Sequence, residues 1–250
     1  MNTAQLVRYL DEYLAIRDTP DGDGALNGLQ VAGPDEVTRI AAAVDASLKS
    51  IRGAVEAGAN LLLVHHGLFW DGNQAVTGAR YRRLKLLLDN DVAVYSAHIP
   101  LDVHPEVGNN ALLARKLGVQ IRGRFGAYQG VDVGIYGDIE VGLRTLAERV
   151  GKVVDANVRV IQGGADPVRR VGIVTGSGAS ALREAAALGL DALITGEASH
   201  HAYFDATEGG VSLLLAGHYS TETLGVGALA EHLHERFQLP WTFLNLPTGL

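Results

Sequence analysis

The sequence predicts an α/β fold built from two related halves, each a mostly parallel sheet with flanking helices. Short apolar runs suited to buried strands alternate with segments of helical pattern. Glycine-containing turns separate them, in a chain with 31 glycines. The same strand–turn–helix–strand order occurs twice. This alternation is typical of βαβ units, and its repetition predicts two similar halves.

In the first half, residues 39–47 predict a strand that runs into a turn, followed by a helix over 48–57. The apolar run 61–64 predicts a second strand, which ends at His65 and His66. A third strand is expected over 92–96, and a helix over 110–117.

The second half repeats this order with a strand and turn over 170–178, a helix over 179–187 and strands over 191–195 and 211–216. A helix is expected over 227–237. In the aligned halves His66 corresponds to Glu197. The pair His98 and Asp102 corresponds to His218 and Glu222, with the same spacing.

We expect the first repeat to occupy residues 1–125 and the second 126–250, with an approximate boundary because the halves are free to exchange elements. The glycine-rich or charged stretches 120–138 and 163–170 are expected to be connectors.

Composition excludes several classes of function. The net charge of −7 argues against general binding to nucleic acid or membrane surfaces. The absence of cysteine excludes disulfides, thiolate metal sites and a cysteine nucleophile. No apolar run approaches the roughly 20 residues of a membrane span, so a cytoplasmic location is expected.

Histidines and carboxylates follow the predicted strands. His65 and His66 end one strand, His98 follows the next, and His218 follows the last. Ligands of open α/β sheets bind beyond the carboxyl ends of the strands, and imidazole with carboxylate suits Zn, Fe, Mn, Co or Ni. The pattern predicts a metal centre. The alternative for the adjacent pair is one packed and one exposed histidine.

Six motifs together resemble a known family, the GTP cyclohydrolase type 2 homologues, which are related to the NGG-interacting-factor-like proteins. The resemblance runs nearly end to end. The motifs are NGLQV at 27–31, VHHGLFW at 64–70, HIPLD at 98–102, HPEVGNN at 104–110, TGEAS at 195–199 and GHYSTE at 217–222.

The resemblance implies a dinuclear metal site whose ligands are His65, His66, Asp102, His218 and Glu222. It also implies a homohexameric ring with the metal sites facing an internal cavity. A chain of 250 residues is similar to the short bacterial form, which lacks the domain inserted in longer members.

Five protein ligands are too many for one catalytic zinc and suit two divalent ions that share a carboxylate. Glu222 is the expected bridge because its side chain is longer than that of Asp102. His98 and Glu197 are candidate catalytic residues for proton transfer, with a structural histidine and a helix-capping carboxylate as the alternatives.

Other features have two interpretations each. His104 is expected in a loop, whereas His200 and His201 either line a cavity and bind substrate phosphate or are simply exposed. The turn at 176–178 either binds an anion through its amides or is a plain tight turn, which we favour. The basic residues at 80–85 either contact a nucleotide or form a solvated helix face, which we favour.

The expected function is a metal-dependent hydrolase, of the GTP cyclohydrolase type, that acts on the ring of a purine nucleotide. The absence of a Gly-x-Ser-x-Gly elbow and of a Walker loop disfavours serine hydrolysis and P-loop chemistry. Two alternatives remain, a two-metal phosphoesterase or nucleotidase and a metal-binding or scaffold protein without turnover.

Overall fold

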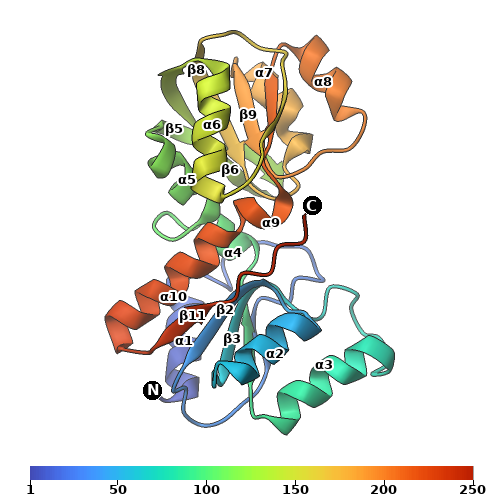
Figure 1. Ribbon diagram of the computed structural model, residues 1–250, viewed down its shortest axis with the longest axis vertical. Coiled ribbons are helices and arrows are strands. Elements are labelled where there is room, and N and C mark those ends of the chain that lie inside the picture. The colour runs from blue at the N-terminus through green and yellow to red at the C-terminus, as the bar shows by residue number, and fades with distance from the viewer. Residues whose placement is uncertain (250) are drawn as a thin grey trace. The chain divides into compact units, whose positions relative to one another are not determined.

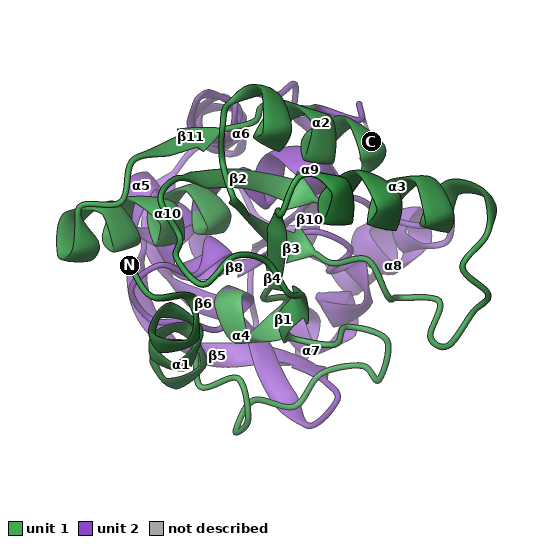
Figure 2. Ribbon diagram, turned by 90° about the horizontal axis from the view of Figure 1, so that it is seen from below, with its two compact units in different colours: residues 1–101, 225–246 green, residues 102–224, 247–250 purple. Residues whose placement is uncertain are grey.

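The computed structural model describes residues 1–249 and divides into two compact units (Figure 2). Unit 1 comprises Met1–Leu101 and Gly225–Leu246, and unit 2 comprises Asp102–Leu224 with the described residues from Pro247 onward. Among the described residues, no helix combines the length and the apolar character needed to cross a membrane.

Unit 1 contains a five-stranded sheet in the order β1-β4-β3-β2-β11, whose strands are labelled in Figure 2. Strands β2, β3, β4 and β11 run parallel to one another, and β1 pairs with β4 in the antiparallel sense. The elements are α1 (Thr3–Tyr13), β1 (Gly28–Val31), β2 (Ile40–Asp45), α2 (Leu48–Glu56), β3 (Leu61–His66), α3 (Gly78–Asp89), β4 (Ala93–Ser96), most of α10 (Thr223–Phe237) and β11 (Trp241–Phe243). The short helix α4 (Ile99–Asp102) contains the point at which the units divide.

Helices cover both faces of this sheet because its strands are apolar on both sides. Helices α2 and α3 pack through Ile51 and Leu87 onto the face that carries Leu62 and Val94. Helices α1 and α10 lie on the other side (Figure 1), where the Tyr95 hydroxyl donates a hydrogen bond of 2.8 Å to Asp11 of α1.

Unit 2 contains a six-stranded sheet in the order β5-β6-β8-β9-β10-β7. Strands β8, β9 and β10 are parallel, and the strands outside them pair in the antiparallel sense. The elements are α5 (Asn109–Leu117), β5 (Gln120–Tyr128), β6 (Val131–Val141), α6 (Leu143–Val154), β7 (Arg159–Ile161), β8 (Val168–Val174), the 3-10 helix η1 (Ala179–Ala181), α7 (Leu182–Ala187), β9 (Ala192–Thr195), α8 (Ala202–Gly209), β10 (Ser212–Leu215) and α9 (His218–Thr221).

The predicted α/β class is confirmed, and the strand order is consistent with the predicted repeat. In unit 1, β2, β3 and β4 lie side by side in parallel, with antiparallel β1 beyond β4. In unit 2, β8, β9 and β10 lie in the same sequence, with antiparallel β7 beyond β10. The mostly parallel arrangement thus describes unit 1 and the centre of unit 2.

The stretch 120–138, predicted as a connector, instead forms most of the antiparallel pair β5–β6. Strand β5 lies at a sheet edge and most of its residues are exposed, so it lacks the apolar run by which buried strands are found. A tight turn joins the strands, because Gln129 at φ 49° and Gly130 at φ 88° both adopt the left-handed region that two-residue hairpin turns require.

The chain crosses between the units differently from a single boundary near residue 125. Asp102 falls in unit 2, and Gly225–Leu246 returns to unit 1. The return has a structural cause, because β11 pairs in parallel with β2 through Trp241 and Ile40.

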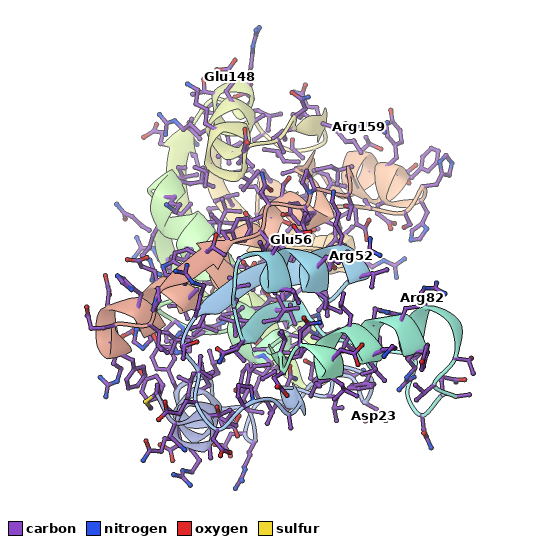
Figure 3. The ribbon with its side chains drawn as sticks, turned by 60° about the horizontal axis from the view of Figure 1, so that its bottom comes forward. Asp23, Arg52, Glu56, Arg82, Glu148 and Arg159 are labelled. Carbon is purple, nitrogen blue, oxygen red and sulfur yellow. The ribbon has the colours of Figure 1, made fainter. Side chains whose placement is uncertain are left out.

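Exposed charges cover the outer helices. Arg52 and Glu56 lie on α2 and Arg82 on α3 (Figure 3), and all three are exposed. Arg80 pairs with Asp71, and Lys85 pairs with Asp89. Arg82 and Lys85 are therefore exposed, as for the solvated helix face that we favoured, whereas the Arg80 side chain is only 14% exposed and lies over the ring of Phe69.

The centre of the unit 1 sheet gives a test of packing. We expect Leu62→Ala to lower the free energy of unfolding by about 2–5 kcal/mol, because Leu62 is fully buried and its loss leaves a cavity. Leu88→Ala on α3, where Leu88 is 63% exposed, is the matched control and should change it by less than about 0.5 kcal/mol. Urea unfolding measures both, and equal losses would contradict the packing described.

Candidate metal centre

Three histidines of unit 1 converge at the carboxyl edge of its sheet. His65 and His66 end β3, and His98 follows β4. One ring nitrogen from each residue lies within 4.8 Å of the others. The ring centroids of His65 lie 4.7 Å from His66 and 5.0 Å from His98. The strand ends therefore bring three imidazoles into one group, although His65 and His66 are adjacent in a strand.

The Nδ1 atom of each imidazole faces a hydrogen-bond acceptor. His65 Nδ1 lies 2.9 Å from the carbonyl oxygen of Ala97, and His66 Nδ1 lies 2.9 Å from Oδ1 of Asp45. A carbonyl or carboxylate oxygen only accepts, so Nδ1 carries the proton in both rings. The lone pair of each neutral ring is thereby placed on Nε2, the arrangement typical of histidines that bind metals.

Several hydrogen bonds hold His98 in place. Its Nδ1 lies 3.0 Å from both carboxylate oxygens of Asp21, and its backbone N–H donates to Oδ1 of Asn27 at 2.7 Å. Asn27 donates to Asp21 at 2.8 Å, and so does the backbone N–H of Ile99 at 3.1 Å. Burial opposes ionisation of Asp21, but the hydrogen bond and charge of His98, with those further donors, lower the pKa of Asp21.

Trp70 borders this group. Its ring meets that of His98 edge-on at a centroid distance of 4.8 Å, and its side chain is 39% exposed. It is therefore part of the rim of the group rather than a core residue.

In unit 2, His218 lies between two carboxylates. Its Nε2 lies 3.2 Å from Oε2 of Glu222, and its Nδ1 lies 3.0 Å from Oε1 of Glu197. The hydrogen bond to Glu222 raises the pKa of His218 to about 9, and Glu197 adds to the rise while burial opposes it. Glu197 thus holds the side of the ring that faces away from Glu222.

Glu222 is buried, with 3% of its surface exposed, and its position depends on a glycine. A Cβ atom on Gly176 would lie 2.2 Å from Oε1 of Glu222, and Gly176 has φ +66°. The backbone N–H of Gly176 also donates to Thr221, the residue before Glu222. Only glycine leaves space for the carboxylate here.

Asp102 is also buried, at 6% exposure, and it accepts a hydrogen bond of 2.8 Å from the side chain of Asn109. The neighbouring Asn110 accepts from the backbone N–H of Thr175 at 2.9 Å, which connects this segment to the end of β8. Asp102 follows His98 as Glu222 follows His218, so the predicted equivalence is preserved in the burial of both carboxylates.

These donor sets fit divalent ions. Each set supplies imidazole nitrogen or carboxylate oxygen, and the histidines are oriented through Nδ1. The cradle at Gly176 keeps one carboxylate buried next to an imidazole. No sulfur ligand is available, since the chain has no cysteine.

The remaining candidates lie elsewhere or have local roles. His104 accepts hydrogen bonds from the backbone N–H groups of Glu106 and Val107, which makes it a loop residue as expected. His200 and His201 are exposed. In the turn at 176–178, the amides of Gly176 and Gly178 donate to threonine side chains, which supports the plain turn.

Sequence reasoning missed Asp45, Asp21 and Asn27. Asp45 could have been found, because it lies near the end of the predicted strand 39–47, and the structure pairs it in register with His66 of the next strand. Asp21 had none, since it lies in a loop 77 positions before its partner His98.

Known proteins match this chain over nearly its whole length. Residues 1–248 match the family model described as Duf34/NIF3 (NGG1p interacting factor 3). A Deinococcus radiodurans protein named GTP cyclohydrolase 1 type 2 homolog is 50% identical over 248 residues, 98% of this chain and 94% of that protein. An Archaeoglobus fulgidus protein of the same name is 42% identical and covers both chains fully.

Solved structures with similar sequences have the same fold over their whole length. The crystal structure of TTHA1606 from Thermus thermophilus matches with a TM-score of 0.91 at 43% identity, over 100% of both chains. The structure of protein ybgI, described as of unknown function, matches with a TM-score of 0.93 at 37% identity, again over 100% of both.

The raised pKa of His218 predicts a dependence of stability on pH in metal-free protein. The folded-state pKa exceeds the unfolded value near 6.5, so the stabilisation is complete below about pH 6.5 and is lost as pH rises through about 9. We expect His218→Asn to cost about 1–3 kcal/mol more at pH 6 than at pH 9.5. Urea unfolding with chelator measures this, and a pH-independent difference would contradict the charge pairing.

Proposed function

Since the chain belongs to the Duf34/NIF3 family, we propose that it is a metal-dependent hydrolase that holds two divalent ions and opens the ring of a purine nucleotide. The observation that carries the proposal is the shared orientation of its histidines. His65 and His66 each have Nδ1 against an oxygen acceptor and so offer Nε2 for a metal. The Nδ1 of His218 is held by Glu197 in the same way, and its Nε2 would bind a metal in place of the proton that it shares with Glu222. The names of the relatives supply the reaction class.

We assign the metal ligands as predicted from the resemblance. His65 with Asp102 would hold one ion, His66 with His218 the other, and Glu222 would bridge them. Glu222 is suited to this role because it is buried and kept in place by the close approach of Gly176. Two bound ions would polarise a substrate atom and lower the pKa of water.

Proton transfer is assigned to His98. Its Nδ1 is held by Asp21, so Nε2 is the atom that would exchange a proton with the leaving nitrogen of the substrate. We assign to Glu197 the positioning of His218, because its carboxylate accepts a hydrogen bond from the Nδ1–H of that ring. In this proposal Glu197 orients a ligand, and Asp21 is the positioning residue for His98.

Elemental analysis of protein purified without chelator tests the metal content. We expect about two divalent ions per chain, and loss of at least one in Glu222→Ala, because a bridging ligand serves both ions. A native protein without tightly held metal would contradict the proposal.

Gly176→Ala gives a sharper test with a matched control. Gly210→Ala introduces a Cβ at φ +72° with no atom within 4 Å, so both variants carry the backbone strain of a left-handed residue. Only Gly176→Ala also drives a Cβ into the Glu222 carboxylate. We expect metal loss in Gly176→Ala and full metal content in Gly210→Ala. Equal metal content in the two variants would contradict the argument that the close approach of Gly176 holds Glu222 in place as a metal ligand.

Activity is tested by incubating metal-loaded protein with GTP. The two products measured are formate released from the purine ring and phosphate released from the triphosphate group. We expect formate, and a decrease of about 10²–10⁴-fold in His98→Gln with its metal retained. Phosphate release without formate would indicate a two-metal phosphoesterase. Neither product from protein that holds two ions would indicate a scaffold, and metal loss in His98→Gln would make His98 a ligand.

A further inference from the structure

Unit 2 contains a pocket of about 480 Å³ at the carboxyl ends of β8 and β9. Such a volume lies within the range of small-molecule sites. Its polar lining residues are Ser177, Ser180, Arg183, Ser199, His201 and Asp205. We propose that this pocket binds a nucleoside phosphate, with the phosphate against Arg183 and the serines and the sugar hydroxyls against Asp205. The inference rests on the proposed function, for which it supplies the substrate-binding subsite.

Arg183 is the residue on which the phosphate assignment depends. Within the part of the chain that the structure describes, its guanidinium makes no ion pair and no hydrogen bond, although neighbouring Glu184 accepts from the backbone N–H of Gly126. An uncommitted guanidinium in a polar pocket is suited to bidentate binding of phosphate. Ser177 and Ser180 line the same pocket, and their hydroxyl groups are further hydrogen-bond donors for a phosphate.

Asp205 distinguishes this pocket from a simple anion site. It lines the pocket together with Arg183, yet the two do not form an ion pair among the described residues. A carboxylate repels phosphate and accepts hydrogen bonds from hydroxyl groups. A ligand that carries both groups, such as a ribose phosphate, satisfies both side chains, whereas free phosphate satisfies only Arg183.

The pocket adjoins the metal-donor residues of unit 2 along the chain. Ser177 follows Gly176, which contacts Glu222, and Ala198 follows Glu197, which holds His218. If a phosphate is bound at Arg183, the rest of the nucleotide would therefore lie in the part of unit 2 that contains Glu222 and His218. His201 also lines the pocket, and its ring lies within hydrogen-bond distance of the Ser199 hydroxyl. The proposal therefore includes the phosphate-binding role that the sequence suggests for this histidine.

Isothermal titration of the full-length protein, as purified and again after chelation of metal, tests the proposal with pyrophosphate, GTP and guanosine as probes. We expect Arg183→Gln to weaken GTP and pyrophosphate by roughly tenfold and guanosine by less than about twofold. The control is Arg144→Gln, an exposed arginine on α6 whose side chain is 93% exposed and does not line the pocket. Asp205→Asn should strengthen pyrophosphate binding by about two- to fivefold, because a like charge is removed.

Two results would overturn the proposal. One is equal affinity of Arg183→Gln and Arg144→Gln for GTP, and the other is pyrophosphate binding as tight as that of GTP, which would leave only a free-phosphate site. Circular dichroism of each variant excludes misfolding as the cause. These outcomes are distinct from the test of the proposed reaction. GTP binding that depends on Arg183, without release of formate, would retain the subsite and reject ring opening. Unchanged release of formate by Arg183→Gln would retain ring opening and reject the subsite.

Discussion

The register between neighbouring parallel strands is the constraint on which the donor groups depend. A histidine offers a lone pair to a metal only at the nitrogen that is not protonated, so each ring needs an acceptor at the other nitrogen. In unit 1 the sheet supplies two of them, since Asp45 of β2 lies opposite His66 of β3, and Ala97 directly follows β4. A slip of one residue would turn His66 to the other face and away from Asp45. The apolar strands that set the register therefore also set the protonation of the rings.

The two units solve the same problem with different residues. Asp45 in unit 1 corresponds to Gly176 in unit 2, and His66 corresponds to Glu197. Unit 1 thus has an acid that holds a histidine across adjacent strands. In unit 2 the acid, Glu197, lies in the loop that follows the next strand, and the glycine leaves space for Glu222. One backbone plan therefore presents two different donor sets, rich in imidazole in unit 1 and rich in carboxylate in unit 2.

Much of this could be predicted from sequence because strand ends are marked by local signals. The apolar run before His65 and the repeated spacing of His98 with Asp102 and of His218 with Glu222 place the donors without knowledge of the fold. The supporting residues were harder to find. Asp21 reaches His98 only through tertiary structure, and β5 is too exposed to resemble a buried strand. The exchange of Gly225–Leu246 depends on the pairing of β11 with β2, which no local pattern encodes.

That exchange has a consequence for the order in which the protein is made. All strands of the unit 2 sheet lie between residues 120 and 215, so the ribosome has synthesised them before β11 exists. Strand β2 is synthesised before unit 2, but its partner Trp241–Phe243 follows every strand of the unit 2 sheet. The nascent chain therefore carries the β2 edge uncovered while unit 2 is completed, and domains tend to fold as they emerge. Closure of the first sheet thus waits until the second sheet has been synthesised, although strands β2, β3 and β4 precede that second sheet in the chain.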